Sequence, residues 1–154
     1  MMKKGNQKIS LVLATPEDVN QYLAIEKSVV GPKTYSGITG EDEAKEELKN
    51  NQVYFIKKDG KIAGTVQYEM KGQSHAYLSG LVICPRFQGQ GIGREASKRI
   101  LQKLKNMKRI DLVTHPRNTR ALMLYLSLGF AIESWKDNYY GDGEPRLLLS
   151  YCRV

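Results

Sequence analysis

The sequence predicts a mixed α/β (α+β) domain, in which a mostly antiparallel central sheet of about seven strands is flanked by four helices. Three observations lead to this fold class. Apolar runs of strand length alternate with amphipathic stretches of helix length, turn residues separate them, and three strand-like runs follow one another without a helix between them. A chain of 154 residues, 41% of them hydrophobic, is expected to form a single domain over 1–154.

The chain is expected to begin with a strand and two helices. Residues 9–14 form an apolar run, and the Thr-Pro-Glu-Asp sequence at 15–18 is typical of a helix start, because Thr caps, Pro suits the first turn and acids complement the helix dipole. This helix should end near Ser28. The Gly- and Pro-containing loop over 31–40 is a candidate substrate flap, and Glu-Lys pairs predict a second helix over 41–50.

Three strands are expected to follow as a meander. Residues 53–57 and 62–70 are strand-like, and the Asp-Gly pair between them supplies the positive backbone angles of a tight hairpin. A second turn over 71–74 leads into a strand over 76–83. Consecutive strands joined by short turns predict antiparallel pairing.

The second half of the chain is expected to combine two helices with the remaining strands. Apolar residues recur at helical spacing over 92–107, and most basic and polar side chains fall on the other face. A strand over 110–114 and a helix over 121–128, ended by a glycine, come next. Two strands over 130–135 and 146–152 then enclose a Gly- and Tyr-rich loop.

Composition narrows the classes of partner. The formal charge of +8 favours anionic molecules through long-range attraction, but the basic residues are scattered and no nucleic-acid-binding motif is present, so no nucleic acid partner is expected. Cys84 and Cys152 lack metal or redox spacing, and no metal ion is expected. No run approaches the ~20 apolar residues of a membrane span and no secretion signal is recognised, so we expect a cytoplasmic protein without a membrane partner.

The segment over 81–94 carries the clearest functional signal, because it runs from a strand through a glycine-rich loop into a helix. Gly89, Gly91 and Gly93 leave backbone N–H groups free beside the positive end of the helix dipole, which favours a phosphate or diphosphate. Arg94 in the first helical turn is suited to add charge-assisted hydrogen bonds. A glycine-rich turn that only joins a strand to a helix is the alternative.

Two other phosphate-binding motifs do not fit this segment. A dinucleotide fingerprint requires G-x-G-x-x-G, but Arg94 stands at the last glycine position and the loop follows an antiparallel meander. A P-loop requires Gly-Lys followed by Ser or Thr, which is absent. The anion expected at this loop therefore needs another explanation.

Two blocks of the sequence resemble the GNAT superfamily of acetyl-coenzyme A-dependent N-acetyltransferases. Residues 88–93 match the family's Q/R-x-x-G-x-G/A motif in full. Asn118, Ala121, Leu124 and Tyr125, followed by a Gly-Phe pair, are similar to its N-x-x-A-x-x-L-Y-x-x-x-G-F block. The chain most resembles the members that acetylate ribosomal proteins and other protein N-termini. The resemblance implies two parallel central strands that splay apart.

The resemblance implies acetyl-coenzyme A as the acyl donor. The backbone of Leu81, Val82 and Ile83 would pair with the pantetheine arm at the edge where the parallel strands separate. The loop amides would bind the diphosphate, and Asn118 would hold the arm or the neighbouring loop. The full expected cofactor site comprises Leu81, Val82, Ile83, Gln88, Gly89, Gln90, Gly91, Ile92, Gly93, Arg94, Asn118 and Tyr125.

Acetyl transfer to an amine needs a neutral nucleophile, a donor for the developing oxyanion and a proton for the leaving thiolate. The resemblance assigns the proton to Tyr125, since a phenol pKa of about 10 lies near the thiol value of about 8.5; plain packing on the helix face is the alternative. An N–H near Val82 is the expected oxyanion donor. Some relatives carry a Glu as general base where this chain has Val113, so Glu69 and His115 are candidates by chemistry alone.

The acceptor is expected to be a primary amine. Tyr139 and Tyr140 resemble the Tyr-Tyr loop of GNAT enzymes that act on protein or peptide N-termini, and Tyr35 is expected to face the same groove. A protein or peptide N-terminus is the first expectation and a small-molecule amine the second. A non-catalytic acyl-coenzyme A sensor is the alternative from another class, and a homodimer is expected from the resemblance.

Overall fold

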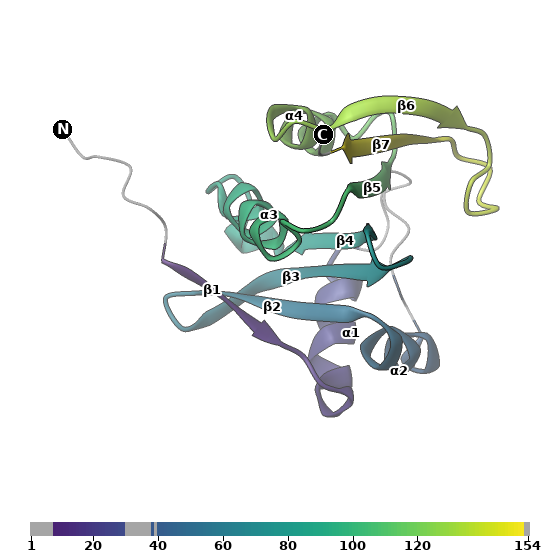
Figure 1. Ribbon diagram of the computed structural model, residues 1–154. Helices are drawn as coiled ribbons and strands as arrows, with labels where there is room; N and C mark the ends of the chain where they lie inside the picture. Colours follow the sequence, from purple (N-terminus) through teal and green to yellow (C-terminus); the bar gives the residue numbers. More distant parts are fainter. Residues whose placement is uncertain (1–7, 30–37, 39, 153–154) are drawn as a thin grey trace.

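The computed structural model describes residues 8–29, 38 and 40–152. These residues form seven strands and four α-helices around one sheet (Figure 1). The strands are β1 (Ile9–Leu13), β2 (Gln52–Lys58), β3 (Lys61–Met70), β4 (His75–Ile83), β5 (Arg109–Thr114), β6 (Ala131–Lys136) and β7 (Arg146–Cys152). The helices are α1 (Val19–Lys27), α2 (Glu41–Asn50), α3 (Ile92–Lys103) and α4 (Thr119–Ser127). The predicted mixed fold class is confirmed.

The sheet has the strand order β1-β2-β3-β4-β5-β7-β6, and every neighbouring pair is antiparallel except β4 and β5. This parallel pair is joined only between His75–Tyr77 and Arg109–Asp111. By contrast, β3 stays paired with β4 as far as Ile83. The two central strands therefore separate toward their carboxyl ends, which confirms the predicted splay.

A β-bulge lies where β4 leaves β5. Gln67 of β3 pairs with Gly80 and Tyr68 pairs with Leu78, so Ser79 is the extra residue on β4. A bulge bends its strand and increases the local twist. The buried Gln67 side chain supports the bend, because its Nε2 lies 3.3 Å from Ser79 Oγ.

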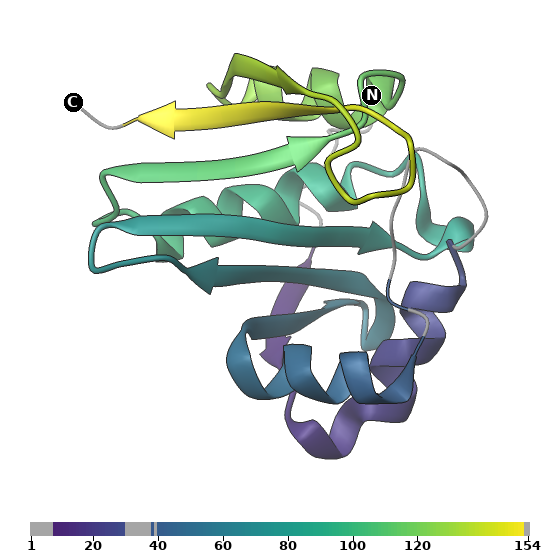
Figure 2. The same cartoon turned by 90° about the vertical axis from the view of Figure 1, so that its right-hand side faces the viewer.

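Helices cover both faces of the sheet (Figure 2). On one face, α3 and α4 pack over an apolar cluster that includes Ile100 and Leu112. On the other face, α1 and α2 pack over a cluster that includes Tyr22 and Leu48. The amphipathic patterns of the sequence thus find their expected apolar partners.

The predicted bounds differ from the observed ones mainly at the end of α3. This helix stops at Lys103, whereas the apolar pattern continued over 92–107. Leu104 has left helical geometry, with φ −96° and ψ 20°, yet its side chain stays buried in the core. Apolar spacing therefore marked burial correctly beyond the point where the backbone ceases to be helical. Across the described residues, none of the helices combines the length and apolar character that a bilayer crossing requires.

Candidate active site

The glycine-rich loop between β4 and α3 has the backbone shape of an anion-binding turn. Gly89 and Gly91 adopt φ angles of +76° and +79°, the left-handed region that suits glycine, and α3 begins directly after Gly91. Across the described ranges, no hydrogen bond involves the backbone N–H groups of residues 89–91. The N–H groups of residues 92–94 lie in the first turn of α3, where the helix itself provides no carbonyl acceptors for them. This loop therefore presents several N–H donors beside a helix N-terminus.

A large cleft of about 560 Å³ extends from this loop between β4 and α4. Its walls include the end of β4, the glycine-rich loop, the start of α3 and part of α4. The expected cofactor residues that line it are Leu81, Val82, Ile83, Gln88, Gly89, Gly91, Ile92, Gly93, Asn118 and Tyr125. The structure thus brings most of the predicted residues around one space.

Two expected cofactor residues, Gln90 and Arg94, do not line the large cleft. Gln90 Oε1 accepts a hydrogen bond from Lys58 Nζ at 2.6 Å, and Arg94 donates to Ser127 Oγ. Arg94 thereby ties α3 to the end of α4 instead of facing the glycine-rich loop. Arg120 lines the cleft, although the sequence analysis did not predict it as a site residue. Its position depends on how α4 is oriented, which no local sequence pattern indicates.

Among the residues that the structure describes, no strand pairs with the cleft-facing edge of β4 beyond Tyr77. The Cys84 N–H donates to Ala63 O of β3 at 2.8 Å, and main-chain groups alternate sides along a strand. Leu81 and Ile83 therefore direct their main-chain groups toward the cleft, while Val82 directs its own toward β3. The expected oxyanion donor near Val82 is thus better matched by the neighbouring Leu81.

Tyr125 lies on α4 at the floor of the large cleft and is 8% exposed. Its ring packs edge-on against Phe130, with ring centroids 5.5 Å apart. Burial raises the pKa of the Tyr125 phenol well above its ordinary value, so the hydroxyl keeps its proton at neutral pH. Asn118 caps the same helix, because its Oδ1 accepts the Ala121 N–H at 3.2 Å.

A second, small cavity of about 90 Å³ lies between the separated halves of β4 and β5. Its walls include Ser79 and Leu81 of β4, Val113 of β5, and Tyr125. Leu81, Asn118, Ala121 and Tyr125 line both spaces. The two spaces therefore adjoin each other at these four residues, which include Tyr125.

The loop between β6 and β7 closes the small cavity through Tyr140 and Arg146. The rings of Tyr139 and Tyr140 meet edge to face at 4.7 Å, and burial together with the neighbouring Tyr hydroxyls raises the pKa of Tyr77 beneath them. Tyr140 lines the cavity, but Tyr139 does not. Arg146 was missed by sequence reasoning, although an arginine at the start of an apolar strand was a visible signal.

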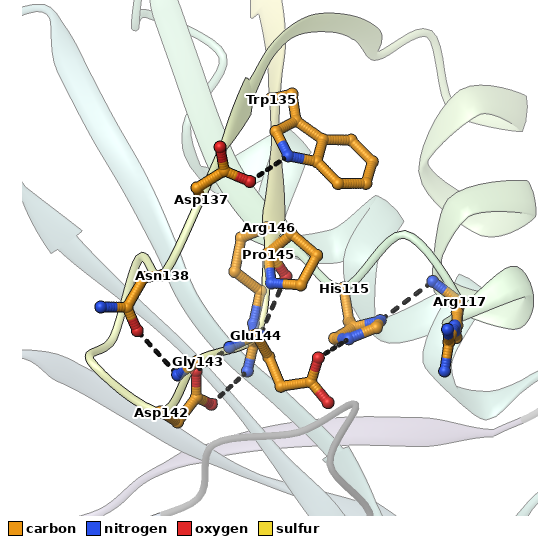
Figure 3. A network of polar contacts seen from close by, with 10 residues as sticks. All are labelled: His115, Arg117, Trp135, Asp137, Asn138, Asp142, Gly143, Glu144, Pro145 and Arg146. Carbon is orange, nitrogen blue, oxygen red and sulfur yellow. Dashed lines mark hydrogen bonds and ion pairs between the residues drawn. The ribbon is translucent and has the colours of Figure 1, made fainter.

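Arg146 is 2% exposed and holds this loop in place (Figure 3). Its Nη1 donates to Pro145 O at 2.9 Å, and its Nη2 lies 3.2 Å from Asp142 Oδ2. Its guanidinium carbon also lies 5.1 Å from the Tyr140 ring centroid. These contacts fix Tyr140 over the small cavity.

Of the two candidate general bases, only His115 lies at a cavity. His115 is 2% exposed and lines the small cavity; its Nδ1 accepts the Arg117 N–H at 3.0 Å and its Nε2 lies 3.5 Å from Glu144 Oε2 (Figure 3). Glu69 lines neither space, and its carboxylate pairs with Lys71 at 3.2 Å. Tyr35 lies outside the described residues. Within the part of the chain that the structure describes, no cluster of His, Cys, Asp and Glu is suited to a metal ion.

Comparisons with known proteins place this geometry in a family. Residues 17–130 match the acetyltransferase (GNAT) family. The chain is 24% identical over 104 residues to the spermidine N(1)-acetyltransferase of Escherichia coli K12, covering 64% of this chain and 56% of that protein. It spans between 30% and 56% of the length of the curated relatives that it matches.

Solved structures show the same fold. The ribosomal-protein-S18-alanine N-acetyltransferase of Escherichia coli superposes with a TM-score of 0.79 at 22% identity, covering 94% of this chain and 93% of that one. A GNAT acetyltransferase of Elizabethkingia anophelis with acetyl-CoA bound gives a TM-score of 0.74 at 20% identity, covering 96% and 100%. Together with the family match over residues 17–130, these findings confirm the resemblance: the chain belongs to the acetyltransferase (GNAT) family.

Proposed function

We propose that the protein is an N-acetyltransferase that moves an acetyl group from acetyl-CoA to a primary amine by direct attack in a ternary complex. One observation carries the proposal: the large cleft and the small cavity share Leu81 and Tyr125 as walls. This arrangement allows a donor in one space to meet an acceptor in the other. Family membership and a structural neighbour with acetyl-CoA bound support acetyl-CoA as the donor.

The residues of the large cleft fit the donor. The positive φ angles at Gly89 and Gly91 and the free N–H groups of the loop suit a diphosphate. The open edge at Leu81 and Ile83 offers main-chain groups to the amides of a pantetheine arm. Gln88 fixes this edge, because its Nε2 donates to Ile83 O at 3.0 Å.

The chemistry then needs few side chains. Bound acetyl-CoA supplies an activated thioester. The Leu81 N–H stabilises the negative charge that develops on the oxygen of the thioester carbonyl. It faces the cleft, and Leu81 and Tyr125 both line the two spaces. The protonated Tyr125 gives its proton to the departing sulfur.

The acceptor that we propose first is the amino terminus of a protein or peptide. The small cavity holds about 90 Å³ and is lined by Tyr140, whose ring packs edge to face with Tyr139, which suits an extended backbone ending in an amine. Structural similarity to the ribosomal-protein-S18-alanine N-acetyltransferase of Escherichia coli supports this choice. A small-molecule amine is the second candidate, and the match to a spermidine acetyltransferase supports it. The cytoplasmic location and the homodimer stay predictions.

Thiol release from acetyl-CoA, measured with a panel of peptides and small amines, tests the proposed function. We expect turnover with at least one amine and a mass increase of one acetyl group on that acceptor. Binding of acetyl-CoA without any turnover would instead support a sensor that has lost catalysis.

A further inference from the structure

The proposed reaction needs a group that accepts the proton of the attacking amine, and the walls of the small cavity lack an obvious one. Val113 stands on β5 at the place where some family members carry a Glu. Among the described residues that line the cavity there is no carboxylate, and His115 is the only imidazole. The proton acceptor must therefore be His115 itself or a side chain that contacts a wall residue of the cavity.

His115 stands on the correct side of the sheet. Side chains alternate along an extended chain, so His115 faces the same side as Val113, two residues earlier, and both line the small cavity. Its ring orientation is fixed, because Nδ1 accepts the Arg117 N–H at 3.0 Å. In a neutral imidazole with Nδ1 as acceptor, the proton sits on Nε2. His115 thus presents an N–H group at Nε2, and neither ring nitrogen is free to take the amine proton.

The Nε2 atom of His115 points at Glu144 in the loop between β6 and β7 (Figure 3). The distance to Glu144 Oε2 is 3.5 Å, a close polar contact without hydrogen-bond geometry. The Glu144 side chain is 24% exposed, so its carboxylate keeps access to water while it contacts a wall residue of the cavity. Its N–H donates to Asp142 Oδ1 at 2.9 Å, which helps to fix the loop.

We propose that Glu144 accepts the proton of the acceptor amine and that His115 is a positioning residue, which keeps the Glu144 carboxylate beside the small cavity through the 3.5 Å contact at Nε2. This proposal rests on the proposed acetyltransferase function. The amine lone pair forms the C–N bond and the C–S bond breaks. Because Glu144 does not itself line the small cavity, the N–H proton passes to its carboxylate through one water molecule, and Tyr125 gives its proton to sulfur. Proton exchange with water then restores both groups.

Other carboxylates near the cavity do not fill this role. Glu69 contacts Lys71 and no residue that lines the small cavity, whereas Glu144 contacts His115. Asp142 lies on the same loop as Glu144, but its carboxylate faces Arg146 at 3.2 Å and helps to fix the loop. Glu69 is therefore the matched control, since it carries the same charge but lines neither space and takes no part in fixing the loop.

The test compares Glu144→Gln, Glu144→Ala and Glu69→Gln with an amine found active in the acceptor panel. We expect Glu144→Gln to lower kcat about 100-fold, the usual contribution of general base catalysis, and Glu69→Gln to lower it less than about 3-fold. Formate should restore part of the activity of Glu144→Ala, because it supplies a carboxylate to the vacated space. A structural role for Glu144 would not produce this rescue.

Variants of His115 test the positioning role. His115→Leu should lower kcat about 10-fold, and His115→Gln, which keeps an N–H donor at similar reach, should lose less. In the Glu144→Gln background, His115→Leu should cause little further loss, because residues that act as a unit are not additive. Acetyl-CoA affinity, measured by calorimetry, should stay unchanged in every variant. This unchanged affinity serves as the control that each variant is folded.

Two outcomes would overturn the proposal in distinguishable ways. If the wild type turns over and Glu144→Gln keeps its kcat, Glu144 is not the base although the enzymatic function stands. If the wild type binds acetyl-CoA but acetylates no amine, both proposals fall together.

Discussion

Replacing Tyr125 with Phe tests the central chemical role in the proposed mechanism. Phe keeps the edge-on packing against Phe130, whose ring centroid lies 5.5 Å away, and removes only the hydroxyl. Within the described residues no hydrogen bond involves this hydroxyl, so its loss leaves none of their polar groups unsatisfied, and the thermal midpoint should not fall. The change therefore isolates proton donation from structure.

The expected loss of kcat is about 100-fold, or about 2.7 kcal/mol on the barrier, at the lower end for a general acid. A thiol with a pKa of about 8.5 is a tolerable leaving group without a proton, which limits the penalty. The burial that raises the pKa of the Tyr125 phenol should also raise that of a thiol departing beside it, so the two stay matched.

The assay is thiol release at saturating amine, together with calorimetric titration of acetyl-CoA. Acetyl-CoA affinity should stay within about 2-fold of wild type, because an interaction used only in the transition state does not contribute to ground-state binding. Tyr54→Phe, on a ring stacked with Tyr68 outside both cavities, serves as the control and should leave kcat unchanged. An unchanged kcat in Tyr125→Phe with normal binding would remove Tyr125 from the chemistry.

Three further predictions concern the loop, the sheet and the buried tyrosines. Gly91→Glu should weaken acetyl-CoA binding at least about 10-fold by placing an anion beside the diphosphate, whereas Gly60→Glu, at a similar φ of +77° in the β2–β3 hairpin outside the large cleft, should leave the affinity unchanged in the same titration. Gly64→Ala should destabilise the fold by about 1–3 kcal/mol in urea titrations, because its Cβ would overlap the carbonyl oxygen of Val82 in β4; a wild-type midpoint would contradict this contact. Burial raises the pKa of Tyr22 and Tyr77 in the folded protein, so above pH ~10 the unfolded chain binds fewer protons and stability should fall as pH rises; replacing either residue with Phe should flatten this dependence.

The glycine-rich loop was predictable because glycine spacing reports backbone conformation directly. Gly89 and Gly91 adopt the left-handed angles that their positions suggested. The strand order from β2 to β4 was equally accessible, since short turns leave antiparallel pairing as the simple solution. These features depend on residues close together in the sequence.

Other features depend on distant parts of the chain. Arg94 faces Ser127 and not the loop, because the direction of its side chain is set by where α4 packs. The open-edge amide belongs to Leu81 instead of Val82, since strand parity is set by the pairing of Cys84 with Ala63. The contact of His115 with Glu144 joins residues that no local pattern connects, and it appears only when β7 lies beside β5.

Three residue pairs, between His75–Tyr77 and Arg109–Asp111, form the whole seam between β4 and β5. Because this seam is short, few hydrogen bonds of the sheet join the β1–β4 half to the β5–β7 half, and the apolar cluster that includes Ile100 and Leu112 supplies most of the contact between them. A ligand that spans the gap beyond Tyr77 would brace the two halves. Amide hydrogen exchange along Leu112–Thr114 should therefore slow when acetyl-CoA is added, and the molecule would gain rigidity from its own donor.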